Sequence, residues 1–178
     1  MISGKSASGK DLFASYLKGL LEYKGNRVLI IHFGDLVKYF ASRYYQWDGN
    51  KDEAGRALLQ HLGTDIMRTK YPTYWAKVVA KFISATNIDW DYVIIPDLRF
   101  ENELKTVQKY NDNVITVRID RYDLDGQPHL NSNMTEAQHN HISECALDDY
   151  PFDWYVLNDG LEDDLRDAAV DFLEEINA

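Results

Sequence analysis

The chain has 178 residues, a length typical of one domain, of which 45% are hydrophobic and 27% are charged. Its four prolines and ten glycines exclude collagen-like and disordered classes, and no apolar run approaches the roughly 18 residues that span a membrane. We expect no secretory signal peptide, and the single cysteine, Cys145, excludes a disulfide within the chain, which suits a cytoplasmic protein.

The net charge of −10 is concentrated near the carboxyl terminus. Residues 144–178 hold twelve acidic residues against one basic residue, a net of −11, so residues 1–143 carry a net of +1. Non-specific binding to nucleic acid depends on Lys and Arg at phosphates, so we expect no nucleic-acid partner, and we expect no membrane partner. A small anionic molecule remains compatible with the nearly neutral remainder of the chain.

Apolar runs typical of buried parallel strands alternate with segments of helical period. In chain order, the sequence predicts a helix over 9–24, a strand over 28–31, helices over 35–46, 52–69 and 73–86, a strand over 93–95, a helix over 100–110, strands over 114–119 and 154–157, and a helix over 161–176. Residues 121–133 follow neither pattern and predict a mobile loop. The alternation predicts a single α/β domain over residues 1–178, with three α/β/α layers and a parallel sheet of about five strands.

A glycine-rich segment precedes the first predicted helix and fits the pattern G-x-x-x-x-G-K. Glycines let the backbone curl so that successive amides point at phosphate oxygens, and the start of the helix adds the positive end of its dipole. A lysine at the end of the pattern reaches the β- and γ-phosphates. We interpret the segment as the phosphate-binding loop of a P-loop NTPase fold, although a loop that only caps a helix is the alternative; its residues are Gly4, Lys5, Ser6, Ala7, Ser8, Gly9, Lys10 and Asp11.

Two features depart from the usual pattern. Asp11 stands where a hydroxyl residue normally contacts Mg²⁺, and a carboxylate can hold magnesium directly or through water. Only Met1–Ser3 precede Gly4, whereas a central strand normally runs about five residues. Either the chain starts late or its first strand is a stub.

Asp97 and Arg99 follow the predicted strand over 93–95 and therefore lie at the carboxyl edge of the sheet, where open α/β folds bind ligands. Asp97 can bind Mg²⁺ through water, and Arg99 can grip a phosphate with two parallel hydrogen bonds. The alternative is that Asp97 caps the following helix and Arg99 is a surface residue.

Four further residues are candidates with structural alternatives. Asp35 follows the strand over 28–31 and serves either the substrate or the N-cap of the next helix. Arg68 is interpreted as a residue that reaches the phosphate of a substrate that would accept a phosphoryl group. Trp75 is interpreted as a core residue or as part of a pocket wall. Asn158, in Asn158-Asp159-Gly160, lies near a nucleotide base or simply forms a turn.

These motifs, together with Phe33-Gly34-Asp35-Leu36-Val37-Lys38 and His141-Ile142-Ser143-Glu144, occur in the order seen in phage-type deoxynucleoside monophosphate kinases. The chain resembles that family over nearly its whole length. The segment Ser143–Asp148, with Phe152-Asp153-Trp154 behind it, is also similar to animal-type phosphomevalonate kinases. Both resemblances imply transfer of the γ-phosphate of ATP to an existing phosphate, so the reaction type is better defined than the acceptor.

The resemblance implies ATP and Mg²⁺ as cofactors and a small-molecule phosphate acceptor, and it leaves a homodimer open. Lys10 and the loop amides would hold the ATP phosphates, with Asn158 near adenine and with Asp11 and Asp97 at the metal. Lys10, Arg99 and Asp97 would be catalytic. The acceptor side would be formed by Asp35, Lys38, Arg68 and Arg99, with Arg118 and Arg121 flanking a small lid at about residues 121–141.

The lid departs from the family pattern because Arg121 is its only arginine. Either helix arginines such as Arg56 and Arg68 supply the missing charge, or phosphoryl transfer is slow. The leading expectation is a (deoxy)nucleoside monophosphate kinase. The alternatives are a phosphomevalonate-like small-molecule kinase and a nucleotide-binding module with little transferase activity.

Overall fold

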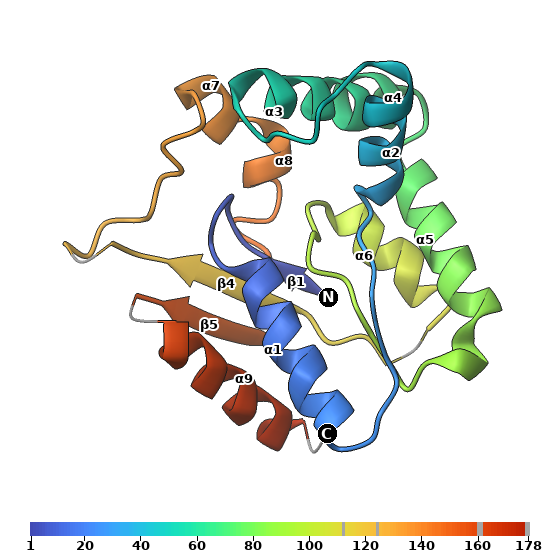
Figure 1. The fold of residues 1–178 in the computed structure, drawn as a ribbon, viewed down its shortest axis with the longest axis vertical. Helices are drawn as coiled ribbons and strands as arrows, with labels where there is room; N and C mark the ends of the chain where they lie inside the picture. Colours follow the sequence, from blue (N-terminus) through green and yellow to red (C-terminus); the bar gives the residue numbers. More distant parts are fainter. Residues whose placement is uncertain (112, 124, 160–161, 177–178) are drawn as a thin grey trace.

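The computed structural model describes residues 1–111, 113–123, 125–159 and 162–176. Leu124 of the predicted lid, Gly160 of the predicted turn and Leu161 at the start of the last predicted helix therefore lie outside the described residues. Within them, strands and helices alternate along the chain as the sequence predicts (Figure 1).

Parallel strands form the centre of the fold. Hydrogen-bonded ladders join β1 to β4 and β4 to β5, and a separate ladder joins β2 to β3. The Ile2 amide donates to the Ile95 carbonyl at 2.8 Å, and the Leu98 amide donates to the Ile2 carbonyl at 3.1 Å. These two bonds connect the ladders in the order β2-β3-β1-β4-β5, and the strands are β1 (Ile2–Ser3), β2 (Val28–Ile30), β3 (Tyr92–Ile94), β4 (Val117–Arg121) and β5 (Trp154–Asn158).

Helices flank this sheet and cross above its carboxyl edge (Figure 1). Their bounds are α1 (Lys10–Tyr23), α2 (Asp35–Tyr44), α3 (Glu53–Gln60), a π-helical turn (His61–Ile66), α4 (Met67–Lys70), α5 (Tyr74–Ala85), a 3₁₀ turn (Asn87–Asp89), α6 (Glu101–Gln108), α7 (Glu136–His139), α8 (Ile142–Cys145) and α9 (Glu162–Glu175).

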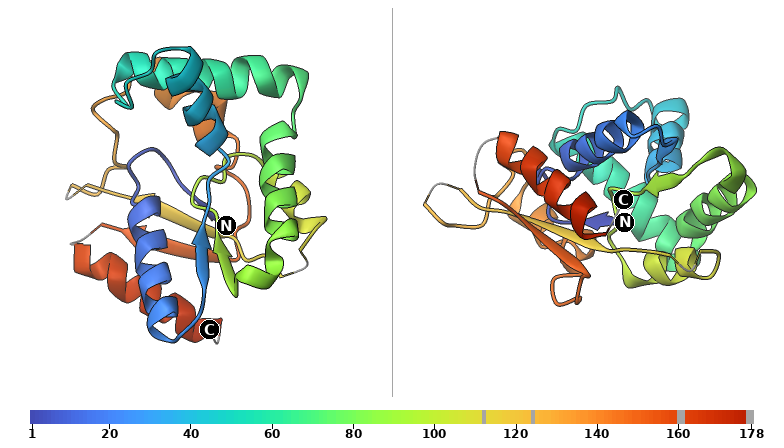
Figure 2. Two further views of the ribbon diagram at one scale, coloured as in Figure 1. Left: turned by 45° about the vertical axis from the view of Figure 1, so that its right-hand side comes forward. Right: turned by 90° about the horizontal axis from the view of Figure 1, so that it is seen from below.

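Two buried clusters hold the layers together. The apolar stripe of α1, including Phe13 and Leu17, packs with Phe172 of α9 against one face of the sheet. Figure 2 shows α1 and α9 side by side in both views. A second cluster joins α2, α5 and α6 to the other side, with Trp75 of α5 and Leu104 of α6 among its members. The predicted α/β class with a parallel sheet is confirmed.

The strand predicted over 114–119 begins later than expected, at Val117. Its neighbour β1 is only two residues long, and the Val117 amide already bonds the carbonyl of Met1 at 2.9 Å. The amide of Thr116 instead donates to the side chain of Asp153 at 2.8 Å. The carbonyl of Thr116 accepts from the Trp154 amide at 3.0 Å, and that of Ile115 accepts from the amino group of Met1 at 2.6 Å, so these residues have backbone partners although the strand pairing begins at Val117. β1 lies at the centre of the sheet as a two-residue element.

The helix predicted over 52–69 is not a regular α-helix along its whole length. Its middle, His61–Ile66, has π-helical hydrogen bonding between α3 and α4. Within this turn the Gly63 carbonyl accepts a hydrogen bond from the Trp75 indole at 3.1 Å. Short π-helical turns are rare in proteins overall, but those that occur often lie at functional sites.

Two other expectations concern the lid and membranes. The predicted loop over 121–133 begins inside β4, which continues to Arg121, and an isolated antiparallel bridge joins Tyr122 to Pro128. Among the described residues, no helix combines the length and the apolar character needed to cross a membrane.

Candidate active site

The glycine-rich segment forms a tight loop between β1 and α1. Gly4 and Gly9 have φ values of +146° and +99°, which favour glycine. A Cβ at Gly4 would lie 2.3 Å from the Ile119 carbonyl oxygen, and one at Gly9 would lie 2.8 Å from Nδ2 of Asn158. The loop thus lies directly against β4 and β5, and the long helix that follows begins at Lys10.

Lys10 is folded back over this loop. Its Nζ donates to the carbonyl of Lys5 at 2.5 Å and to Oγ of Ser8 at 3.3 Å, and the residue is only 8% exposed. Burial lowers the pKa of Lys10 to about 7, and the charge of nearby Arg99 acts in the same direction. An anion bound in the loop would therefore stabilise the protonated form of Lys10.

Two adjoining cavities open at the carboxyl edge of the sheet. The loop cavity, of about 420 Å³, is lined by Ser6, Ala7, Lys10, Asp11, His32, Lys38, Lys51, Arg56, Leu59, Gln60, Thr64, Pro96, Asp97, Arg99, Asn131, Met134, Ser143 and Glu144. The inner cavity, of about 140 Å³, is lined by Phe33, Gly34, Val37, Lys38, Leu59, Gly63, Thr64, Arg68, Trp75, Asp97, Arg99, Phe100, Glu103 and Ser143. Six residues, among them Lys38, Asp97 and Arg99, line both cavities, so the two form one continuous cleft.

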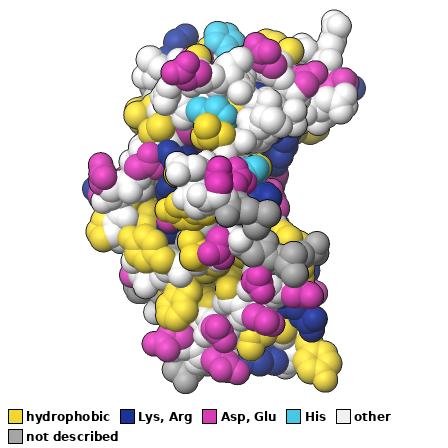
Figure 3. All heavy atoms as spheres, turned by 90° about the vertical axis from the view of Figure 1, so that its left-hand side faces the viewer, with side chains coloured by type: hydrophobic (Ala, Val, Ile, Leu, Met, Phe, Trp, Pro, Cys, Tyr) yellow, Lys and Arg dark blue, Asp and Glu magenta, His cyan; other side chains and the backbone are white. Residues whose placement is uncertain are grey.

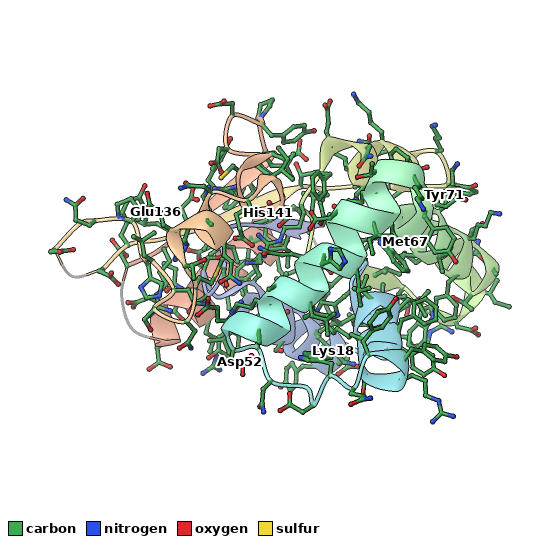
Figure 4. The ribbon with its side chains drawn as sticks, turned by 90° about the horizontal axis from the view of Figure 1, so that it is seen from above. Lys18, Asp52, Met67, Tyr71, Glu136 and His141 are labelled. Atoms are coloured by element: carbon green, nitrogen blue, oxygen red, sulfur yellow. The ribbon has the colours of Figure 1, made fainter. Side chains whose placement is uncertain are left out.

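The helical segment above the cleft and the α7–α8 region close it from outside. Figure 4, which looks down on this edge, shows the segment from Asp52 to Tyr71 crossing over the sheet, with Glu136 and His141 beside it. Figure 3 shows the side of the molecule hollowed at mid-height, with Lys and Arg side chains at the rim of the hollow. The arrangement suits a charged ligand that enters between the upper helices and the sheet.

Asp97 connects two loops at this edge. Its carboxylate accepts hydrogen bonds from the amides of Phe33 and Gly34, both at 2.9 Å. Asp97 does not cap α6; Glu103 does so instead, accepting from the amides of Arg99 at 2.7 Å and Phe100 at 2.9 Å. The alternative interpretation of Asp97 as a helix cap is therefore wrong.

Arg99 lies in the cleft and is not a surface residue. Its Nη1 donates to the carbonyls of Gly4 at 3.2 Å and Ser143 at 3.3 Å and pairs with Oε2 of Glu144 at 2.9 Å. The guanidinium therefore joins the loop to the α8 segment while it lines both cavities.

Arg68 is fixed at the end of the inner cavity by two contacts. It forms an ion pair with the fully buried Glu103, and its guanidinium lies 4.2 Å from the centre of the Phe100 ring. Burial raises the pKa of the Glu103 carboxyl above its ordinary value, while the charge of Arg68 opposes this shift. A partly buried guanidinium held in one geometry is suited to contact an anionic acceptor.

The two predicted residues of α2 behave differently. Lys38 lines both cavities and pairs with Asp35 at 3.2 Å. Asp35 lines neither cavity, and Gly34 rather than Asp35 occupies the N-cap position of α2. Its carboxylate instead accepts from the His32 amide at 3.0 Å, so the interpretation of Asp35 as N-cap is wrong.

The structure does not bring Arg118 to the cleft. Its guanidinium is bound by Asp120 at 2.8 Å and by Asp148 at 3.2 Å, and its side chain is 9% exposed. These two carboxylates hold it on β4, outside both cavities, which corrects its predicted place at the acceptor.

Arg121 and Asn158 contact the loop from β4 and β5. Arg121 donates to the Ala7 carbonyl at 3.1 Å, and Asn158 Nδ2 donates to the Ser8 carbonyl at 2.9 Å. Arg121 thus contacts the loop directly but lines neither cavity, so its predicted contact with the acceptor gains no support from the cavity lining.

Arg56, which the sequence analysis offered only as a source of missing charge, and Asn131 contact the phosphate-binding loop directly. Arg56 of α3 donates from Nη1 to Oγ of Ser6 at 3.2 Å, and Asn131 donates to the same oxygen at 3.0 Å. The Nε atom of Arg56 is buried and, within the described chain, has no hydrogen-bond partner. Glu144 stood in a quoted motif, yet nothing in its local sequence indicated contact with the loop, because that contact crosses 138 positions.

The loop cavity contains carboxylates that could hold a divalent cation. Within the described ranges, no three His, Cys, Asp or Glu side chains gather as a metal cluster. Asp11 and Asp97 both line this cavity with Lys10. Mg²⁺ is commonly held by one or two carboxylates together with substrate phosphates, so this pair of carboxylates fits a magnesium ion that arrives with a nucleotide. A hydrogen bond from His32, at 3.1 Å, lowers the pKa of Asp11 and keeps it ionised.

Comparison with known proteins identifies a family. A family model described as deoxynucleotide monophosphate kinase matches residues 35–168, a range that begins after the glycine-rich loop. The deoxynucleotide monophosphate kinase of Escherichia phage RB69 is 29% identical over 133 residues, covering 74% of this chain and 49% of that protein. The protein of the same description from Enterobacteria phage T4 is 31% identical over 112 residues, covering 62% and 41%. The chain thus spans about half the length, or less, of the curated relatives it matches.

Solved structures with a similar fold include two of the APS kinase from Mycobacterium tuberculosis. One is a mutant, with a TM-score of 0.50, and the other is a complex with AMPPNP and APS, with a TM-score of 0.51. Both are 15% identical to this chain, cover 97% of it, and are themselves covered over 94% and 95%. At this identity the likeness shows the fold alone, which is that of a P-loop kinase.

Proposed function

This chain belongs to the deoxynucleotide monophosphate kinase family, and we propose that it transfers the γ-phosphate of ATP to a deoxynucleoside monophosphate. The observation that carries the proposal is the continuous cleft, in which the loop cavity with Lys10 meets the inner cavity with Arg68. A transferase needs two such sites whose ligands meet end to end, whereas a binding module needs only one.

The reaction requires positioning more than proton transfer. The bond between the γ-phosphorus and the β,γ-bridging oxygen breaks, and an oxygen of the acceptor phosphate bonds to that phosphorus, which yields ADP and a deoxynucleoside diphosphate. The acceptor oxygen is already anionic near neutral pH, so no general base is needed. In this proposal the loop amides and Lys10 hold the donor phosphates, while Arg99 and Lys38 lie where the two phosphate groups meet.

Magnesium would be held by Asp11 and Asp97 together with the donor phosphates. When bound, it supplies positive charge to the phosphate oxygens. The remaining charge comes from the chain itself. Arg56 contacts Ser6 in the loop and lines the loop cavity, which supports the prediction that a helix arginine replaces the arginines missing from the lid.

The inner cavity supports a nucleotide acceptor rather than an acyclic phosphate such as phosphomevalonate. Phe33, Val37, Trp75 and Phe100 offer apolar and aromatic walls for a flat base, and Arg68 and Lys38 offer cations for the phosphate. An aromatic wall beside fixed cations matches a ligand that has both a ring and a charged end.

A coupled assay of ADP release, run over a panel of monophosphates, tests the proposal. We expect release with at least one deoxynucleoside monophosphate and little with phosphomevalonate. Tight ATP binding without release for any acceptor would favour a nucleotide-binding module, and release only with phosphomevalonate would favour the other kinase family.

A further inference from the structure

The phosphate-binding loop already holds an anion that belongs to the chain. Oε2 of Glu144 accepts a hydrogen bond from the Ser6 amide at 2.8 Å, and the same oxygen lies 2.9 Å from Nη1 of Arg99. The Glu144 side chain is 8% exposed and lines the loop cavity with Lys10. A carboxylate is thus bound inside the cavity that the proposed function assigns to phosphate.

The partners of this carboxylate are groups that bind phosphate well. A loop amide and a guanidinium are both donors to oxyanions, and they bind carboxylate and phosphate in similar geometry. The Ser6 side chain is held separately by Arg56 and Asn131, so the amide of Ser6 keeps its direction into the cavity. A partly buried amide and guanidinium without an anion would each lose a hydrogen bond at a cost in stability, which Glu144 prevents.

The backbone around Glu144 is attached to the same loop. Nζ of Lys5 donates to the carbonyl of Glu144 at 2.9 Å and pairs with Asp148 at 2.5 Å, and Arg99 donates to the carbonyl of Ser143. The Glu144 side chain can therefore leave the loop while its backbone stays in place. Release needs a change of side-chain rotamer and no opening of the fold.

We propose that Glu144 is an internal anion that occupies the phosphate site of the free loop and that the triphosphate of the donor nucleotide displaces it. This inference rests on the proposed function in one respect, the identity of the displacing ligand. One amide proton cannot serve two anions, and a phosphate beside the carboxylate would be repelled. Displacement also transfers Arg99 from the carboxylate to phosphate, so binding of the donor prepares the residue that meets the acceptor.

The competing interpretation is that Glu144 stays in place and orients Arg99 in the complex. The two interpretations predict opposite effects of removing the charge. If Glu144 competes with phosphate, Glu144→Gln tightens phosphate binding; if it only orients Arg99, the same change weakens it or leaves it unchanged.

Calorimetric titration of the full chain with inorganic tripolyphosphate and with ADP decides between them. We expect Glu144→Gln and Glu144→Ala to bind tripolyphosphate roughly tenfold tighter than the wild type, a gain of about 1.4 kcal/mol, since the phosphate no longer competes with a carboxylate for the same donors. The matched control is Glu101→Gln, an equal change of charge on an exposed side chain two residues from Arg99, which should alter affinity less than twofold.

Equal or weaker binding by both Glu144 variants, with unchanged melting temperatures, overturns the inference. The transfer assay separates this from failure of the proposed function. Tighter tripolyphosphate binding without transfer to any monophosphate leaves the displacement intact and removes the kinase. Phosphoryl transfer by the wild type without tighter tripolyphosphate binding by the Glu144 variants supports the kinase and overturns the displacement. If none of the proteins binds tripolyphosphate, both proposals are overturned.

Discussion

The loop cavity and the inner cavity share one edge of the sheet but differ in what forms their walls. One wall of the first is the contiguous segment Gly4–Asp11, whose glycines allow close contact with β4 and β5. The second is shaped by side chains that come from α2, the π-helical turn, α5 and α6. Backbone geometry is encoded locally by glycine, whereas a cavity made of side chains depends on how distant elements pack. Changes in the loop cavity should therefore affect chemistry, and changes in the inner cavity should affect the choice of acceptor.

The largest effect should come from Lys10→Ala in the loop cavity. Loss of a preorganised charge at the transferred phosphate should lower turnover by about 10²–10³-fold or more. The fold should remain, because the buried ammonium is held mainly by loop atoms. Steady-state turnover and thermal unfolding of the purified variant test this, and turnover equal to that of the wild type would remove the loop from the reaction.

Arg99 lines both cavities, so Arg99→Lys tests how they are connected. Lysine keeps the charge but lacks the planar fork, so we expect a loss of about 2–4 kcal/mol in kcat/KM for the acceptor and a smaller loss for ATP. The exposed Arg27→Lys is the control and should change neither constant more than about twofold. A rise confined to the KM for ATP would assign Arg99 to the donor instead.

Asp97→Asn changes a residue that lines both cavities. Asparagine offers one acceptor oxygen, so one of the amides of Phe33 and Gly34 would lose its partner. We expect the free energy of unfolding to fall by about 1–3 kcal/mol. Denaturant unfolding measures the loss, and an unchanged midpoint would contradict the role of Asp97 as a connection between the two loops.

The smallest effect should come from Gly63→Ala in the inner cavity. A Cβ at Gly63 would lie 3.5 Å from Val37, an ordinary contact, so the fold should tolerate it. The added methyl reduces the space for the acceptor, and we expect the acceptor KM to rise by roughly threefold to tenfold with the KM for ATP unchanged. A parallel rise in both constants would mean that the two cavities do not act separately.

The same contrast explains what the sequence could predict. The alternation of strands and helices and the loop with Lys10 follow from local patterns, and the fold confirms them. The position of Arg99 followed from the rule that parallel strands present their carboxyl ends at one edge. The contact of Glu144 with Ser6 and the pairing of Arg118 with Asp148 join remote segments, which one sequence does not encode locally.

The predicted boundaries of one helix and one strand were wrong for a related reason. The segment 52–69 has the apolar period of a continuous helix, and the π-helical turn inside it arises where the Trp75 indole binds the Gly63 carbonyl. That partner comes from another helix. Similarly, β4 starts at Val117, where the amide of the preceding residue, Thr116, donates to the side chain of Asp153 from a remote segment.

The π-helical turn also sets the angle, around the helix axis, between the side chains of Arg56 and Arg68. Arg56 precedes the turn and lines the loop cavity, and Arg68 follows it and lines the inner cavity. In an unbroken α-helix of 3.6 residues per turn, side chains twelve positions apart would diverge by about 120° around the axis. The wider π-helical turn rotates less per residue and reduces this divergence, so both guanidinium groups face the cleft below the helix. If His61–Ile66 were regular α-helix of the same length, the divergence of about 120° would return and Arg68 would be rotated away from Glu103, separating charge on the acceptor side from charge on the donor side.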